Sequence, residues 1–179
     1  MSITRMYTIA QAKEIAAAWD SSYGRTDDVI FYAFRILSNN EQDLSAKCKL
    51  LKSFYSVPRP DSIEIIVKHI SQNIHNIEQR LAKGDLSIVE EIARNPNGTR
   101  QFSFATKFCS FHNPTAYPIF DSSVRNALRR EGVSNNKFDS DFLLFKKEID
   151  AFIARNSLQG CSYKEIDHLL QEIGTICDG

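Results

Sequence analysis

Apolar residues recur every three or four positions along most of the chain, which is the spacing of one buried helical face. The longest stripe starts after Asp61 and has isoleucine or leucine at positions 63, 66, 70, 74, 77 and 81. A stripe of this length predicts one helix that ends at Gly84, because glycine readily adopts the left-handed conformation of a helix C-cap. No segment alternates apolar and polar residues as a strand would. The chain is therefore expected to be all-α.

Capping patterns divide the chain into about nine helices. Capping boxes of the S/T-x-x-E/Q form are expected to start helices at Thr8, Ser87 and Ser162. Asp121 is placed to cap the helix that follows it. The predicted helices span residues 9–19, 26–37, 42–55, 61–83, 87–94, 101–111, 122–130, 139–155 and 162–173. They are expected to form one compact domain over residues 1–179, or two intimately packed helical lobes.

The composition is that of an ordinary soluble globular protein, with 42% hydrophobic and 25% charged residues. The 22 lysines and arginines balance the 22 aspartates and glutamates, so the net charge is zero. This balance argues against a protein that binds nucleic acid through its overall charge, and it leaves a local basic patch open.

The four cysteines, Cys48, Cys109, Cys161 and Cys177, are far apart, and none has the spacing of a metal site. Free thiols in a reducing compartment are therefore expected, with no bound metal. No apolar signal segment begins the chain, and no stretch approaches the roughly 20 apolar residues of a membrane span. The sequence thus predicts a cytoplasmic protein without a membrane partner.

One segment combines an amine and a carboxylate in an otherwise aromatic setting. It contains Lys107, which is flanked by Phe104, Phe108 and Phe111, and it ends at Asp121. Loss of water around a lysine disfavours its charged form, and an uncharged amine is a nucleophile. This segment is therefore the candidate for chemistry.

The same segment resembles the core of the helix-hairpin-helix base-excision DNA glycosylases, and in particular the bacterial 8-oxoguanine DNA glycosylase-like proteins. The run Ser103-Phe104-Ala105-Thr106-Lys107 is similar to the hairpin that supplies the lysine in that superfamily, with Ser103 and Ala105 in the two glycine positions. Pro118-Ile119-Phe120-Asp121 is similar to the segment that supplies the aspartate. The resemblance covers about residues 40–175, and its specific part is short.

The resemblance implies a compact helical glycosylase-like domain with a degenerate helix-hairpin-helix, acting on duplex DNA that carries a damaged or modified base. Lys107 would attack the sugar C1′ and form a Schiff base, and β-elimination would then cut the strand. Asp121 would deprotonate the lysine and stabilise the positive charge that develops on the sugar. No cofactor is implied, and the cysteines of the iron–sulfur cluster found in some relatives are absent.

Further residues become candidates for contact with DNA. Phe102, Phe104 and His112 are candidates for a pocket that holds the flipped base. Ser103 and Ala105 would lie near a phosphate if the hairpin is kept. A local excess of positive charge between residues 96 and 135 favours phosphate contacts. Its cations are Arg100, Lys107, Arg125, Arg129 and Arg130.

Each candidate also has a structural interpretation. A lysine on an amphipathic helix commonly keeps its amine at the surface, and Asp121 is well placed to be only an N-cap. His112 is equally suited to hydrogen bonding at a helix C-terminus. Because both hairpin glycines are missing, the alternative is a catalytically inactive helical module that binds DNA or a protein partner. A helical adaptor without any nucleic-acid role is the third interpretation.

Overall fold

The computed structural model describes residues 6–22, 26–57, 62–94 and 99–175. Within these ranges every regular element is a helix, apart from an isolated bridge between Arg94 and Arg100. The all-α prediction is therefore confirmed for the part of the chain that is described. None of the helices in these ranges is both long enough and apolar enough to cross a membrane.

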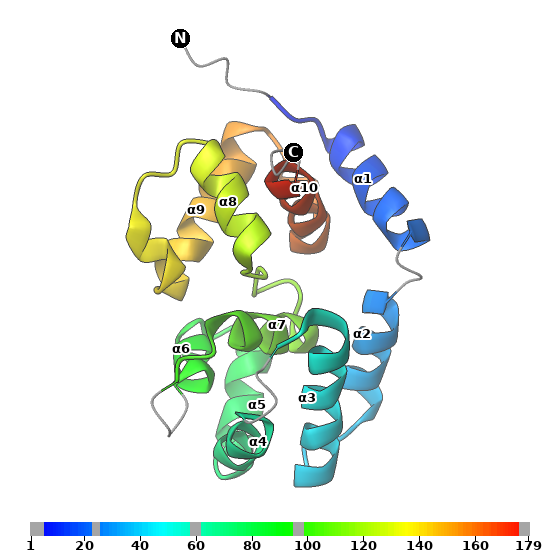
Figure 1. The fold of residues 1–179 in the computed structure, drawn as a ribbon, viewed down its shortest axis with the longest axis vertical. Helices are drawn as coiled ribbons and strands as arrows, with labels where there is room; N and C mark the ends of the chain where they lie inside the picture. Colours follow the sequence, from blue (N-terminus) through cyan, green and yellow to red (C-terminus); the bar gives the residue numbers. More distant parts are fainter. Residues whose placement is uncertain (1–5, 23–25, 58–61, 95–98, 176–179) are drawn as a thin grey trace. The chain divides into compact units, whose positions relative to one another are not determined.

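The chain divides into two compact units, which Figure 1 colours along the sequence. We call residues 25–117 the central unit, and residues 1–24 with 118–179 the terminal unit. The central unit contains α2 (Thr26–Ile36), α3 (Glu41–Tyr55), α4 (Ile63–Ser71), α5 (Ile74–Lys83), α6 (Ser87–Ala93) and α7 (Phe102–His112). The terminal unit contains α1 (Ile9–Ser22), α8 (Ser122–Arg130), the 3-10 helix η2 (Asn136–Asp139), α9 (Phe142–Arg155) and α10 (Tyr163–Thr175).

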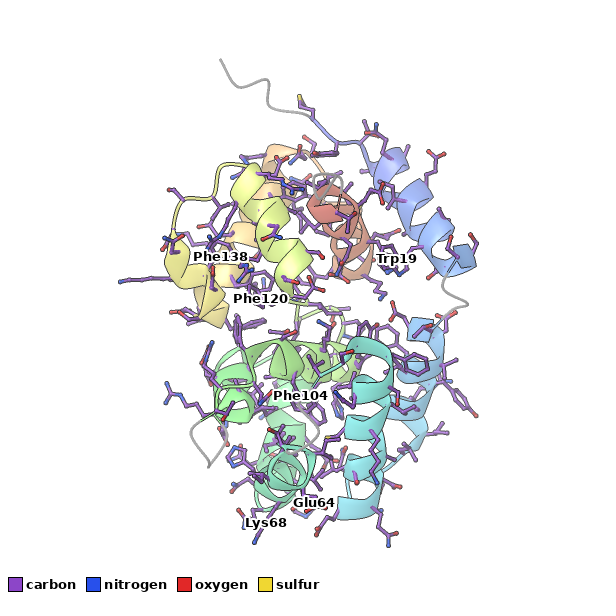
Figure 2. The ribbon with its side chains drawn as sticks, viewed as in Figure 1. Trp19, Glu64, Lys68, Phe104, Phe120 and Phe138 are labelled. Carbon is purple, nitrogen blue, oxygen red and sulfur yellow. The ribbon has the colours of Figure 1, made fainter. Side chains whose placement is uncertain are left out.

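The core of the central unit is built around α7. Nine of the eleven residues of this helix are buried, and α2, α3, α5 and α6 all contact it. Phe104, which is labelled in Figure 2, is completely buried here. A helix that is buried on nearly every side must satisfy its polar side chains inside the protein, because water cannot reach them.

The long helix predicted for residues 61–83 is wrong, because two helices occupy this range. The first, α4, ends at Ser71, and α5 begins at Ile74. Asn73 between them has φ −127° and ψ 22°, which is not a helical conformation. Asparagine side chains compete for backbone hydrogen bonds and favour such breaks. Apolar spacing alone does not reveal the break, because the stripe continues across it.

The predicted capping boxes at Thr8 and Ser162 are confirmed. The Thr8 amide donates to Gln11 Oε1 at 2.9 Å, and the Gln11 amide donates back to Thr8 Oγ1 at 3.2 Å. The Ser162 amide donates to Glu165 Oε2 at 2.7 Å in the same way. The capping box predicted at Ser87 is wrong, because Ser87 instead bonds to the carboxylate of Asp85.

In the terminal unit, α10 packs against both α8 and α1. The ring of Trp19, labelled in Figure 2, stacks on the ring of His168 with centres 5.1 Å apart. Where α10 packs against α8, Gly174 approaches the α8 backbone closely. A Cβ atom at position 174 would lie 2.3 Å from the Ser123 carbonyl oxygen. Glycine at position 174 therefore sets how closely α8 and α10 can pack.

We expect Gly174→Ala to lower the free energy of unfolding of the terminal unit by about 1–3 kcal/mol, because the new methyl group must push the two backbones apart. The single tryptophan of the chain, Trp19, lies in this unit, so its fluorescence during urea titration measures the effect. The matched control is Gly160→Ala, whose Cβ would meet only the flexible end of Ile9 at 3.1 Å. Equal midpoints for the Gly174 variant and the parent would contradict the packing argument.

Candidate functional site

Lys107 lies in the middle of α7, and only 3% of its surface is exposed. Its Nζ donates a hydrogen bond to the hydroxyl of Ser103, one helical turn earlier, at 3.2 Å. The same Nζ lies 5.4 Å from the centre of the Tyr55 ring, within the range of a cation–π contact. The expected loss of water around Lys107 is confirmed, and the aromatic ring beside its amine is that of Tyr55.

Sequence reasoning missed an acidic residue that is linked to this site through Tyr55. The Tyr55 hydroxyl donates a hydrogen bond to the carboxylate of Asp27, and Asp27 is 8% exposed. Asp27 comes from the first turn of α2 and Tyr55 from the last residue of α3, so their meeting depends on tertiary packing. Lys107, Tyr55 and Asp27 thus form a row that links an amine, a phenol and a carboxylate, with Lys107 and Asp27 buried and Tyr55 partly exposed.

The residues predicted to replace the hairpin glycines lie inside a helix. Ser103, Phe104 and Ala105 belong to the first turns of α7, and the Ala105 amide donates to the Gln101 carbonyl at 2.9 Å. Before them, Arg94 and Arg100 form an isolated antiparallel bridge, and residues 95–98 lie outside the described part. The helix predicted for residues 101–111 is therefore confirmed, and Ser103 and Ala105 lie in it and not in the tight turn that the resemblance implied.

Asp121 belongs to the terminal unit, where it caps α8 as predicted. Its Oδ1 accepts a hydrogen bond from the Val124 amide at 3.0 Å. Its Oδ2 accepts a hydrogen bond from the side-chain amide of Gln171 on α10. Both carboxylate oxygens therefore have a structural partner, and each retains further lone-pair capacity.

Of the predicted pocket residues, Phe102 and Phe104 are core side chains. Phe102 is 7% exposed, and the guanidinium of Arg100 covers its ring at 4.1 Å from the centre. Phe104 is fully buried and packs against Phe108, with ring centres 5.7 Å apart. Neither ring presents an open face for a base in this conformation.

The predicted basic island is distributed over both units, and most of its cations are engaged within the protein. Arg100 pairs with Glu90 at 2.7 Å, and Arg129 pairs with Asp139 at 2.8 Å. Arg130 donates to the carbonyls of residues 173 and 174, and Lys107 is buried. Arg125 on α8 is half-buried. The five cations are therefore not an open cluster of equivalent phosphate ligands.

A second buried lysine, which the sequence analysis missed, lies on α3. Lys47 is completely buried, and its Nζ donates to Asn39 Oδ1 at 2.6 Å. The Asn39 side-chain amide donates in turn to Glu78. Burial lowers the pKa of Lys47, and the negative charge of Glu78 opposes that change. The signal for this residue was present in the sequence, because position 47 falls on the apolar stripe between Leu44 and Leu51.

His112 ends α7 beside this lysine. Its ring packs against Phe34 and Phe108, with centres 5.1 Å and 4.7 Å away, and its Nε2 is buried without a hydrogen-bond partner among the described residues. Burial, and after it the positive charge of Lys47, lowers the pKa of His112 to about 3. His112 is therefore neutral over the physiological range.

His112 also lines a surface pocket of about 630 Å³. The other lining residues are Asp28, Phe31, Tyr32, Phe34, Arg35, Phe111 and Pro114. A second depression, of about 840 Å³, lies between α3 and α4, where Figure 2 labels Glu64 and Lys68 on its rim. The predicted site residue His112 lines the first of these pockets. Phe111, in the wall of the same pocket, is one helical turn from Lys107.

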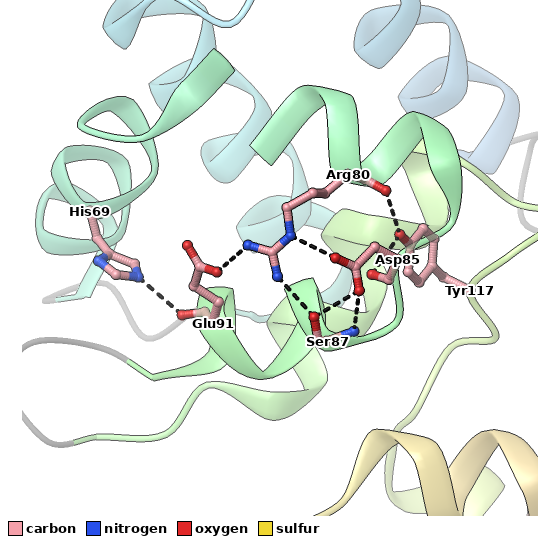
Figure 3. Close-up of polar contacts among 6 residues, drawn as sticks. All are labelled: His69, Arg80, Asp85, Ser87, Glu91 and Tyr117. Atoms are coloured by element: carbon pink, nitrogen blue, oxygen red, sulfur yellow. Dashed lines mark hydrogen bonds and ion pairs between the residues drawn. The ribbon is translucent and has the colours of Figure 1, made fainter. Parts of the chain in front are cut away.

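The Gly84-Asp85 turn is fixed by a network that Figure 3 shows. Arg80 donates to Asp85 at 2.7 Å, to Ser87 at 2.9 Å and to the carboxylate of Glu91. The hydrogen bond from the Ser87 hydroxyl, followed by that from Arg80, lowers the pKa of Asp85 to about 2. The Tyr117 hydroxyl donates to the Asp85 carbonyl at 3.1 Å, which ties the last residue of the central unit to this turn. The network is a structural clamp between α5 and α6.

We expect His112→Phe to reduce the loss of stability that the parent shows between pH 6.5 and pH 4. The unfolded chain takes up a proton at His112 near the ordinary value of 6.5, whereas the folded protein does so only near pH 3. The contribution of His112 to the free energy of unfolding therefore falls as the pH falls through this window, by a few kcal/mol. Urea titrations across this range measure the difference.

Lys47→Met is the matched comparison, because it removes the positive charge of Lys47, which is the second cause of the lowered pKa of His112, and leaves the burial of His112 in place. Lys47→Met should therefore narrow the pH range over which the protein loses the contribution of His112, and part of that range should remain. An identical pH profile for the parent and the His112 variant would contradict the assignment.

We expect Asp85→Asn to be less stable than the parent above about pH 4, by a difference that shrinks as the pH falls from 4 toward 2. The folded-state pKa of Asp85 is about 2 and its ordinary value is 3.8, so its contribution is present above 3.8 and disappears as the pH falls toward 2. Because 38% of the Asp85 side chain is exposed, the difference should stay below about 1 kcal/mol. Acid titration of both proteins, with Ser87→Ala as an intermediate case, measures it. A difference that persists undiminished at pH 2 would contradict the charge-based explanation.

Among the residues that the structure describes, no group of histidine, cysteine, aspartate or glutamate side chains is arranged to hold a metal ion. Cys48, Cys109 and Cys161 are free thiols, and Cys177 lies outside the described residues.

Comparisons with known proteins add one relative and one family. Over 90 residues the chain is 39% identical to an uncharacterized protein of Haemophilus influenzae, and the match covers 49% of this chain and 42% of that relative. The matched segment is thus less than half of the length of the curated relative. No solved structure matches the chain. Residues 9–116, from the start of α1 to the residue before Tyr117, match the family described as "HI_0787_N: N-terminal domain". This range is more than half of the chain, so the protein belongs to the HI_0787_N N-terminal domain family.

Proposed function

We propose that this protein is a lysine-dependent DNA glycosylase and AP lyase that acts on a damaged or modified base. The observation that carries the proposal is the setting of Lys107, a buried amine held by Ser103 beside the ring of Tyr55. Burial of a lysine is costly, so a protein that keeps one inside an aromatic core has a reason for it. The similarity of residues 103–107 and 118–121 to the glycosylase motif adds support from the sequence.

In the proposed reaction the lone pair of Lys107 Nζ forms a bond to C1′ of the damaged nucleotide. The bond between C1′ and the base breaks, the base leaves with the bonding electrons, and the proton that the attacking amine loses neutralises the departing base. Opening of the sugar ring converts the C1′ adduct into a Schiff base. Removal of a C2′ proton then expels the 3′ phosphate and cuts the strand.

The substrate must reach a lysine that is only 3% exposed. The target nucleotide therefore has to leave the base stack, and the side chains over Lys107 have to move aside. The cost of base flipping is lowest for a damaged or unpaired base, which favours lesions over intact DNA. We propose that the protein meets this DNA in the cytoplasm.

Asp121 has the electrostatic role in the proposal, as the carboxylate that stabilises positive charge on the sugar. Its hydrogen bonds with Val124 and Gln171 would hold the carboxylate in one orientation. A carboxylate that is already held in one orientation needs little reorganisation when positive charge develops on the sugar.

The second candidate is a catalytically inactive helical module that binds DNA or a protein partner. Arg100, Arg129 and Arg130 are engaged within the protein, so they offer little charge for a DNA substrate, and this favours the protein-partner form of the second candidate. The helical placement of Ser103 and Ala105 also favours it, since their amides are not presented to a phosphate as those of hairpin glycines would be.

Borohydride trapping separates the two candidates. The full chain is incubated with duplexes that contain an abasic site or 8-oxoguanine, and sodium borohydride reduces any Schiff base to a stable adduct. We expect a covalent adduct that is lost, by at least about 100-fold in yield, in Lys107→Met, because the attacking amine is gone. Peptide mass spectrometry of the adduct identifies the modified lysine.

Lys47→Met is the matched control, because Lys47 is also a buried lysine of the central unit. It should keep the adduct. Asp121→Asn tests the charge separately, since asparagine also caps a helix, and it should slow release of the base without unfolding α8. Absence of an adduct on every lesion would overturn the lyase proposal, and salt-dependent DNA binding without an adduct would favour the second candidate.

A further inference from the structure

The outward face of α2 is apolar although it is exposed. Val29 is 52% exposed, Tyr32 57% and Ile36 58%. These are three of the seven large hydrophobic side chains that are strongly exposed in the described part of the chain, and they lie within eight residues of one helix. Buried residues Ile30 and Phe34 occupy the opposite face. A concentrated apolar surface on one helix is typical of an interaction site.

The exposed residues form two rows along α2, which is labelled in Figure 1. Residues seven apart return to nearly the same side of a helix, about 10 Å further along its axis. Val29 and Ile36 therefore form an apolar row, and the exposed Asp28 and Arg35 form a charged row beside it. Tyr32 lies between the two rows, and the Arg35 guanidinium is 5.8 Å from the centre of its ring.

This face is complementary to itself. The midpoint between residues 28 and 35 and the midpoint between residues 29 and 36 both fall within one residue of Tyr32. If a second α2 lies antiparallel across a two-fold axis at Tyr32, each Asp28 faces the other Arg35. The same operation places each Val29 against the other Ile36. In a two-fold dimer the same surface serves both subunits, so a surface of this kind needs opposite charges at equal distances from the axis.

We propose that two copies of this chain associate through α2, antiparallel, around a two-fold axis that passes close to Tyr32. The contact consists of an apolar centre from Val29, Tyr32 and Ile36 and of two ion pairs between Asp28 and Arg35 at its edge. A pocket of about 630 Å³ borders the charged row, lined by Asp28, Phe31, Tyr32 and Arg35 of α2 and by Phe111 and Pro114. It provides aromatic surface for the long side chains that the partner brings to the edge.

A second copy fits this face better than an unrelated protein does. The face carries both Asp28 and Arg35, so an antiparallel second copy brings the opposite charge to each of them. A helix of eleven residues is only about 16 Å long, so the contact is small for a stable dimer. The complex should therefore dissociate on dilution. It does not depend on the proposed DNA chemistry, because neither Lys107 nor Asp121 belongs to α2.

Charge reversal tests the pairing directly. Asp28→Arg gives a chain with arginine at both ends of the charged row, and Arg35→Asp gives a chain with aspartate at both ends. In a two-fold dimer each single variant places like charges together, whereas a mixture of the two variants places opposite charges together. Sedimentation velocity of the full chain, from low micromolar to several hundred micromolar protein, reports the association.

We expect the parent to dimerise with rising concentration and each single variant to associate at least about tenfold more weakly. The equimolar mixture, and the double variant Asp28→Arg with Arg35→Asp, should regain the association. Tyr32→Glu should abolish it, whereas Leu143→Glu, at an equally exposed apolar residue of α9, should leave it unchanged. Circular dichroism confirms that each variant is folded.

A parent chain that stays monomeric over the whole range would overturn the proposal. The same holds if the mixture of single variants fails to associate while the parent dimerises, because dimerisation would then use another surface.

Discussion

Burial of α7 is the constraint on which the central unit depends. Four helices, α2, α3, α5 and α6, pack around it, and each brings apolar side chains to a helix that has almost no face left for water. The polar side chains of α7 must then be satisfied locally. Thr106 donates to the Ser103 carbonyl at 3.1 Å and Lys107 donates to the Ser103 hydroxyl, so one residue at the start of the helix serves two polar groups. His112 leaves Nε2 buried without a hydrogen-bond partner among the described residues, and this position is where the stability of the unit becomes sensitive to pH.

The same constraint shapes the chemistry that the site can perform. A lysine at the surface would be solvated and mobile, whereas Lys107 has a fixed direction and is shielded from water. Tyr55 of α3 contacts Lys107 and donates to Asp27 of α2, so these side chains connect α7 to two other helices. In the proposed reaction, access for a nucleotide would require part of this packing to open. Reactivity at Lys107 would then be opposed to the stability of the core, and the substrate would have to supply the binding energy that opens it.

Local features of this fold could be predicted from the sequence, and long-range pairings could not. The boxes at Thr8 and Ser162 and the cap at Asp121 join residues three positions apart, so their residue types determine them. Asp85 displaced the cap predicted at Ser87 because Arg80, from the preceding helix, holds its carboxylate in place. The Tyr55–Asp27 contact joins residues 28 positions apart, and the partners of Arg100 and Arg129 lie ten positions away. Residue spacing reveals that such side chains exist, and only the packing of helices decides which of them meet.

The residues that match the family come from both units. It covers residues 9–116 and so ends one residue before the central unit does, yet it begins with α1, which belongs to the terminal unit. In this chain α1 packs on α10, with Ala12 fully buried and Trp19 stacked on His168. The segment that defines the family therefore includes a helix whose packing surface is supplied by residues beyond the match. Residues 118–175 are then part of what keeps α1 folded, and a relative that lacks an equivalent of α10 must cover the apolar face of its first helix in another way.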